Sequence, residues 1–327
     1  MFNEEVKNAF LRTVCKESVR NRISLIFRNS SEFEQELGKD LSEFNNDDIQ
    51  RLFNKYGGAR HSAKITFTSH LSRYLEWASQ NGFNVICDLS KIDHIGDSVA
   101  KFRAKMVFSP EHLNRYMDVV FGSVDNETVG VAYRCYLWLA FCNVELDAAM
   151  ELTTSDVDID LMRVMVSGRE IPLYKESIRA FELAKNLKRF RVIKSNTTAE
   201  IYTDREDGTR LLRASKRAGV SKKDYDSRLM TGEVARNIRL AYNKGIIQTR
   251  IGYSTVRLSG IFYRALLREQ MGMEPNFQAI VDMEMAGYQA ATNLNYNSRK
   301  CRLLGNYKRD YEIWKMAYEM FEEDSHL

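Results

Sequence analysis

The sequence predicts a mainly helical protein with one small β-sheet, divided into two domains. Three observations predict this class. The chain has 327 residues, enough for two cores, and only 3 prolines, too few breakers for an all-β fold. Apolar residues recur at helical spacing over most of its length. Ser109-Pro110-Glu111 is a strong helix start, which marks the beginning of a second domain. We therefore expect domains at residues 1–106 and 107–327.

The first domain reads as a compact block of helices. Residues 1–30 predict two helical pieces, and the polar run at residues 29–31 predicts a joint before a glutamate-rich helix. Asn45 and the acids after it predict an N-cap and first turn, since side-chain oxygens accept bonds from free amides there. Further helices are expected at 62–80 and 90–105.

The second domain combines helices with short strands. Residues 129–143 are apolar on most faces, which is typical of a buried helix. Alternating apolar residues predict short strands at 157–159, 164–166 and 171–173, with Ser167-Gly168 as a turn. The remaining elements expected are helices at 174–188, 231–243 and 307–321 and extended pieces at 190–193 and 200–203.

Positive charge is concentrated in one part of the chain. The net charge is +4, but residues 185–250 contain 17 Lys and Arg against 7 Asp and Glu, a local balance of +10, so the remainder sums to −6. Concentrated charge favours a polyanion, because each neutralised phosphate releases counterions. The alternative is a solvated helix face that acids elsewhere in the chain balance.

Other composition features exclude several classes of protein. The five cysteines have no metal-like spacing, which fits reduced core thiols and a cytoplasmic location. No apolar run reaches ~18 residues, so we expect no membrane association. No glycine-rich phosphate loop, dinucleotide fingerprint or metal-ligand cluster occurs, so we expect no cofactor and no metal.

One stretch, from Tyr253 to Tyr296, carries a family resemblance. It contains Ser254-x-x-Arg257, then Gly287-Tyr288, then Tyr296. This order resembles the tyrosine recombinases, or phage integrases, in which His-x-x-Arg precedes a Gly-His step and a nucleophilic tyrosine. The string SDVDID…MVSGREIPLY also follows the family's small sheet. The resemblance implies a helical core-binding (SAM-like) domain followed by a recombinase-like catalytic-type domain.

The same comparison indicates that the catalytic groups are missing. Counting back from Ser155-Asp156 puts Glu145 where the family has its first arginine, and Arg169 is the nearest base to the family's hairpin lysine. Ser254 and Tyr288 replace the two histidines, and no histidine lies between His112 and His326. The family's chemistry needs fixed positive charge and proton transfer at the phosphate, so we expect no catalytic residue in this chain. We expect Arg257 and Tyr296 to serve in packing or in phosphate contact instead.

Basic residues from both domains are candidates for phosphate contact. Those near residues 60–73 are also explained almost as well by a solvated helix face. The predicted DNA-binding set is Arg60, Lys64, Arg73, Arg169, Lys188, Arg189, Arg210, Lys216, Arg217, Lys222, Lys223 and Arg257.

These observations predict a sequence-specific DNA-binding protein without strand cleavage. The resemblance implies a repressor of phage or prophage genes that maintains lysogeny, located in the cytoplasm with the bacterial nucleoid. Its expected partners are double-stranded DNA, a second copy bound through the C-terminal helix, and an antagonist or inducer protein. Two alternatives stay open: an active divergent recombinase that uses Tyr296, and an accessory protein that binds other proteins.

Overall fold

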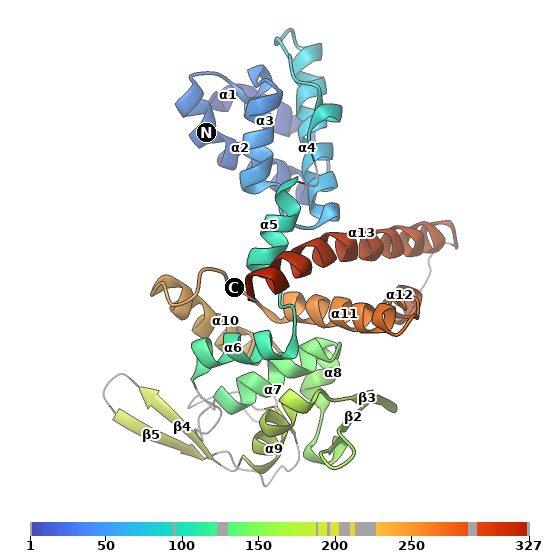
Figure 1. Ribbon diagram of the computed structural model, residues 1–327. Helices are drawn as coiled ribbons and strands as arrows, with labels where there is room; N and C mark the ends of the chain where they lie inside the picture. The colour runs from blue at the N-terminus through green and yellow to red at the C-terminus, as the bar shows by residue number, and fades with distance from the viewer. Residues whose placement is uncertain are drawn as a thin grey trace. The chain divides into compact units, whose positions relative to one another are not determined.

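A computed structural model describes residues 2–93, 96–122, 130–187, 189–194, 197–202, 210–212, 227–286 and 293–325 (Figure 1). The chain forms two compact units. The first contains Met1–Arg103 together with Phe277–Leu327, and the second contains Ala104–Asn276. The prediction of a mainly helical fold with a small sheet is confirmed. The division differs from the predicted domains, since residues 277–327 belong with the first unit.

The first unit is helical throughout its described part. Most of its helices lie close to the predicted bounds, but α5 begins six residues later than predicted, α12 was not predicted, and two further differences are treated below. They are α1 (Glu4–Thr13), α2 (Glu17–Leu37), η1 (Leu41–Glu43), α3 (Asn46–Tyr56), α4 (His61–Gln80), η2 (Leu89–Lys91), α5 (Gly96–Lys105), α12 (Phe277–Ala286) and α13 (Asn293–Ser325).

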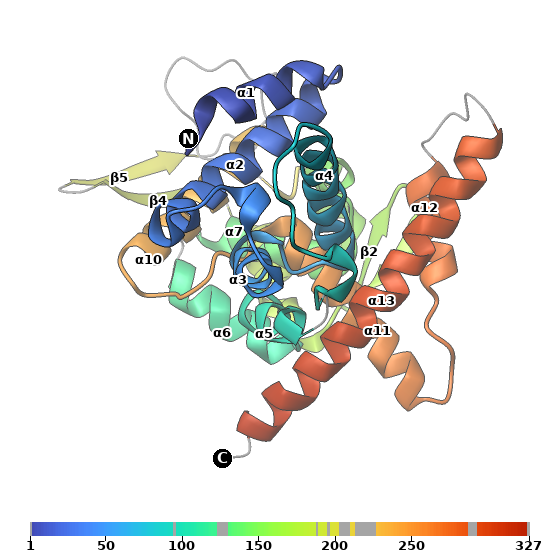
Figure 2. The ribbon, with the colours of Figure 1, turned by 90° about the horizontal axis from the view of Figure 1, so that it is seen from above.

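Aromatic side chains and one buried charge network hold α1, α2 and α4 together. Phe27 of α2 packs edge-on against Tyr74 of α4, with ring centroids 4.8 Å apart, and Figure 2 shows these two helices side by side. Lys7, Glu34 and Asp40 are almost fully buried nearby. The ammonium group of Lys7 pairs with Glu34, and Asp40 accepts a hydrogen bond of 2.8 Å from the Tyr74 hydroxyl. The buried charges are thus paired and hydrogen-bonded, as burial requires.

The predicted joint at residues 29–31 is wrong, because α2 continues through it. Ser30 is buried, and its hydroxyl lies 3.1 Å from the Phe27 carbonyl and 3.1 Å from the Glu34 carboxylate. Its polar group is therefore satisfied inside the helix. The N-cap expected at Asn45 is confirmed, since its side chain accepts a hydrogen bond of 2.9 Å from the Asp48 amide.

The second of these differences is α13, which is much longer than the helix expected at residues 307–321. It packs antiparallel to α12, with Phe277 close to Tyr311 (ring centroids 5.3 Å). Asp310 on α13 is fully buried and accepts bonds of 3.0 Å from the His61 amide and from the Arg60 guanidinium. Asp310 thereby caps α4, whose own N-cap residue makes no side-chain cap. This contact explains why residues 277–327 group with the first unit.

The second unit contains the strands. Its elements are α6 (Pro110–Phe121), α7 (Gly130–Phe141), α8 (Leu146–Glu151), η3 (Thr154–Asp156), β1 (Val157–Asp158), β2 (Arg163–Val166), β3 (Arg169–Pro172), η4 (Lys175–Ser177), α9 (Ile178–Asn186), β4 (Arg189–Lys194), β5 (Thr197–Tyr202), α10 (Ser227–Asn243) and α11 (Tyr253–Gln270).

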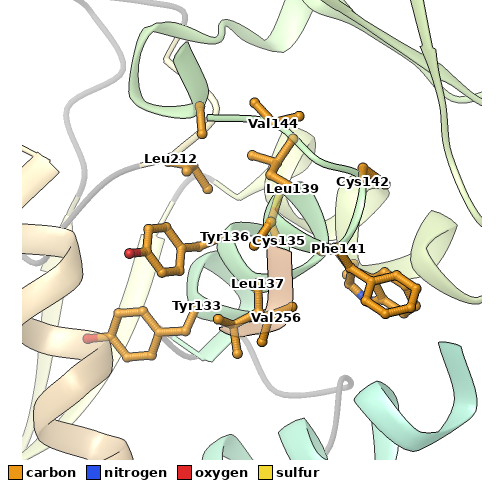
Figure 3. Close-up of a cluster of buried hydrophobic side chains, with 14 of the residues drawn as sticks. Tyr133, Cys135, Tyr136, Leu137, Leu139, Phe141, Cys142, Val144, Leu212 and Val256 are labelled. Atoms are coloured by element: carbon orange, nitrogen blue, oxygen red, sulfur yellow. The ribbon is translucent and has the colours of Figure 1, made fainter. Parts of the chain in front are cut away.

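Helix α7 is the centre of this unit, as its apolar sequence predicts, and all twelve of its residues are buried. Figure 3 shows α7 side chains packed with Leu212 and Val256 from neighbouring segments. Helix α11 crosses α7 very closely at Gly260, where a Cβ atom would lie 1.9 Å from the Phe141 carbonyl oxygen. Only glycine allows this crossing, which places the start of α11 against the end of α7.

The small sheet has the predicted order and turn. β1, β2 and β3 pair antiparallel, with Val164 opposite Val157 on one side and Ile171 on the other. Ser167 and Gly168 both have positive φ, 49° and 78°, as a two-residue hairpin requires. The helix start at Ser109 is also confirmed, because its hydroxyl accepts a bond of 3.1 Å from the His112 amide. β4 and β5 form a separate antiparallel hairpin.

Candidate nucleic-acid interface

Arg257 is held by the segment that joins α7 to α8. It lies in the second turn of α11, and its side chain is 20% exposed. The guanidinium Nε donates a hydrogen bond of 2.8 Å to the side-chain oxygen of Asn143, and one terminal nitrogen lies 3.4 Å from the Glu145 carboxylate. Arg257 is thus fixed in position, with part of its surface open to solvent.

Asn143 reaches Arg257 because the chain turns sharply after α7. Its φ of 63° is left-handed, a conformation that asparagine tolerates better than other side-chain-bearing residues. The amides of Asn143 and Val144 donate back to carbonyls of α7 at 2.8 and 2.9 Å, which closes the helix end. The role of Asn143 was not predicted, although an asparagine directly after an apolar helix is a signal for this turn.

Helix α11 fixes the same segment at two further points. The hydroxyl of Tyr253 donates to the Val144 carbonyl at 2.9 Å, and the guanidinium of Arg264 donates to the Cys142 carbonyl at 3.0 Å. Burial raises the pKa of the Tyr253 hydroxyl well above its usual range, and it raises the pKa of the Cys142 thiol to about 11. Both groups therefore stay protonated at neutral pH.

Glu145 brings negative charge to this site. It is the N-cap residue of α8, and its side chain is 61% exposed but makes no cap hydrogen bond. Its carboxylate faces Arg257 instead, so the pair is close to neutral.

Arg169 and Ser254 lie at other exposed points of the second unit. Arg169 begins β3 directly after the hairpin turn and is exposed. Ser254 is exposed in the first turn of α11. Neither is a proton-transfer group of the kind that the family resemblance implies at its place.

Tyr296 lies in α13 and belongs to the first unit, while Arg257 belongs to the second. One turn later, Lys300 forms an ion pair of 2.5 Å with Asp282, and the hydrogen bond to Asp282 raises the pKa of Lys300. The positive charge of Lys300 is therefore already paired with a carboxylate. Gly287 and Tyr288 lie outside the described residues.

The predicted DNA contacts on α4 need correction. The side chain of Lys64 is fully buried, with its ammonium group 5.1 Å from the centre of the Phe53 ring, so it is withdrawn as a surface contact. Arg60 is half-exposed but is bound to Asp310 at 3.0 Å. Arg73 is exposed. Helical periodicity did not reveal the burial of Lys64, because a lysine stem packs as an apolar side chain does.

The basic segment of the second unit is only partly described. Arg210 lies 3.0 Å from the Glu151 carboxylate, and its backbone pairs with Thr153. Arg189 begins β4. The other predicted contacts, Lys188, Lys216, Arg217, Lys222 and Lys223, lie outside the described residues. Within the described part, no group of three or more His, Cys, Asp and Glu side chains could hold a metal ion, and no described helix is long and apolar enough to cross a membrane.

Comparison with known families finds one match. Residues 1–80 match the family model described as "MrpR, N-terminal core-binding domain". This confirms, for these residues, the resemblance to core-binding domains that the sequence predicts. No curated protein sequence matches the chain.

Among solved structures, the chain is similar to the XerA recombinase, at 12% identity and a TM-score of 0.36, covering 98% of each chain. It is also similar to the Tn1549 transposon integrase, residues 82–397, in complex with circular intermediate DNA, at 16% identity and a TM-score of 0.34, covering 89% of this chain and 94% of that one. Scores this low assign no activity.

Proposed function

We propose that this protein binds specific DNA sequences on a recombinase-like scaffold, does not cleave DNA, and represses phage or prophage genes to maintain lysogeny. In these respects it resembles the master repressor of SPβ-type prophages, a tyrosine-recombinase-like protein. The core-binding match at residues 1–80 supports DNA binding. A second copy bound through the C-terminal helix, an antagonist or inducer protein, and a place on the bacterial nucleoid complete the proposal.

The observation that carries the proposal is the pairing of Arg257 with Glu145. Cleavage by a tyrosine develops negative charge on the attacked phosphate, and loss of one preorganised donor at such a centre costs about 2.7 to 4 kcal/mol. Here the place that the resemblance gives to the first arginine holds a carboxylate, 3.4 Å from the remaining arginine. That carboxylate opposes the developing charge.

DNA binding tolerates the carboxylate of Glu145 beside Arg257, whereas DNA cleavage does not. Affinity for DNA is summed over many phosphate contacts, and base contacts add the specificity. One neutralised arginine removes a single contact from that sum. A protein with a carboxylate at this position can therefore still bind DNA after it has lost the ability to cleave DNA.

The proposal is tested by enrichment of bound duplexes from a genomic library, followed by binding titrations of full-length protein at several salt concentrations. We expect repeated sites beside phage promoters, with affinity that falls steeply with salt. The double variant Arg257→Ala and Arg169→Ala should bind more weakly, with a salt slope reduced by about 1, because Glu145 already neutralises much of the charge of Arg257. Arg179→Ala, in an exposed pair with Glu182, is the matched control.

Two results would count against the proposal. Affinity without salt dependence or sequence preference would favour the accessory protein. Unchanged affinity in the double variant would exclude Arg257 and Arg169 as DNA contacts.

A further inference from the structure

Three atoms that can donate hydrogen bonds are buried without a partner in one part of the second unit. They are the indole Nε1 of Trp138, the hydroxyl of Tyr174 and the terminal nitrogen Nη2 of Arg264. We call these three side chains the donor cluster. None of the three atoms has a hydrogen-bond partner within the part of the chain that the structure describes. Native proteins satisfy almost all buried polar atoms, so several such atoms in one place indicate a water molecule or an ion between them.

The side chains of the donor cluster are neighbours at the end of α7. The rings of Trp138 and Tyr174 have centroids 6.1 Å apart. The other terminal nitrogen of Arg264 donates to the Cys142 carbonyl at 3.0 Å. Cys142 lies one helical turn after Trp138, to whose carbonyl its amide donates at 2.8 Å, and Figure 3 shows it beside Phe141. The cluster thus joins α7, α11 and the segment before η4.

The donor cluster carries a positive charge that no carboxylate of the described residues neutralises. An arginine keeps its charge in proteins, and the two terminal nitrogens of Arg264 meet one carbonyl and no other acceptor. Burial raises the pKa of the Tyr174 hydroxyl, and the charge of Arg264 lowers it by less, so the hydroxyl stays protonated and can donate. The indole nitrogen of Trp138 can only donate. A cation with two neutral donors is the complement of an anion rather than of a water molecule.

The packing around the donor cluster limits the size of its ligand. Trp138 is fully buried, and the ring of Phe141 lies 5.2 Å from that of Tyr174 between centroids. Tyr174 and Arg264 are only partly buried, which gives a small ion a route from solvent. The ligand is therefore of the size of chloride or formate.

We propose that the donor cluster binds a small monovalent anion, a halide or a short carboxylate, which accepts hydrogen bonds from Trp138, Tyr174 and Arg264. Arg264 also holds the connection after α7, which carries Asn143 and Glu145. A bound anion would thus fix the segment that positions Arg257. The inference does not depend on the proposed function, since it requires no DNA.

The test follows the indole N–H signals in the NMR spectrum of full-length protein that contains isotope-labelled tryptophan. The chain has 3 tryptophans, so Trp77 and Trp314 serve as internal references, and Trp138→Phe assigns the remaining signal. Sodium chloride or sodium formate replaces sodium gluconate at constant ionic strength, because gluconate is too large for the site. We expect one of the two small anions to move the Trp138 signal to a saturable end point. The anion that acts distinguishes a halide from a carboxylate site.

Tyr174→Phe is the decisive variant, because it keeps the ring and removes only the hydroxyl. It should weaken anion binding by about 10-fold. Arg264→Gln should abolish the response, and thermal melting checks that both variants fold. Tyr242→Phe, which removes a hydroxyl from a 43% exposed side chain on α10, is the matched control and should bind as wild type does. A Trp138 signal that responds to neither anion, or an equal affinity in Tyr174→Phe and wild type, overturns the inference.

Discussion

The side chains around Arg257 set how strongly it would attract a phosphate in the proposed DNA complex. Asn143 orients the guanidinium without changing its charge, whereas Glu145 neutralises much of it. Both residues come from one short connection after α7. A change at either position therefore acts on the same arginine in a different way.

Removal of the carboxylate should strengthen DNA binding. Glu145→Gln leaves the hydrogen bond from Arg257 to the Asn143 side-chain oxygen in place and frees the positive charge. We expect affinity for random duplex to rise by about 3- to 10-fold at low salt, since one more phosphate is neutralised. The matched control is Glu182→Gln, which removes an exposed acid paired with Arg179. An equal rise in both variants would assign the effect to net charge and not to Arg257.

His112 predicts a pH dependence of stability. Burial lowers the pKa of this histidine from 6.5 to about 4. Between these values the unfolded chain binds a proton that the folded chain does not, so the free energy of unfolding decreases as pH falls through this window, by up to about 3 kcal/mol. Urea denaturation at pH 7 and pH 5 should show a smaller difference in His112→Gln than in wild type. Equal differences, or an NMR titration of His112 near 6.5, would contradict this account.

At the scale of elements, local signals predicted most of the helices and the sheet. Ser109, Asn45 and the Ser167-Gly168 turn act through bonds to nearby amides or through their own backbone conformation, so the sequence reveals them. The joint expected at Ser30 was wrong because its polar group is satisfied by Glu34, which belongs to a tertiary network. Sequence spacing alone cannot show such a partner.

The crossing of α7 and α11 should be intolerant of any side chain at Gly260. Gly260→Ala would drive the new methyl group into the Phe141 carbonyl, and we expect a loss of about 1–3 kcal/mol or more. Gly232→Ala in α10 is the control, because a Cβ there meets nothing within 4 Å and alanine favours the helix by about 0.5–1 kcal/mol. Urea denaturation measures both. Equal stability of the two variants would contradict the close crossing.

The buried network of α1 and α2 should depend on both of its charges. Lys7→Met leaves the Glu34 carboxylate buried beside Asp40 without its cation, at a cost of about 3–5 kcal/mol. The double variant Lys7→Met and Glu34→Gln removes the unpaired charge and should recover part of that loss. Denaturation of the two variants gives the comparison. A double variant less stable than Lys7→Met would show that the pair is not coupled as described.

At the scale of the whole molecule, charge patterning along the chain predicts only part of the candidate interface. The basic segment from residue 185 onward stands out by composition. Lys64 was misassigned because its charge was visible in the sequence and its burial was not.

The central claim is that this protein binds DNA without cutting it. The most direct measurement incubates full-length protein with its own enriched duplex, nicked near the centre so that a cleaved strand cannot rejoin, and then denatures the mixture. We predict a full mobility shift before denaturation and no covalent protein-DNA product afterwards. A covalent product that Tyr296→Phe abolishes would contradict the claim and establish an active recombinase.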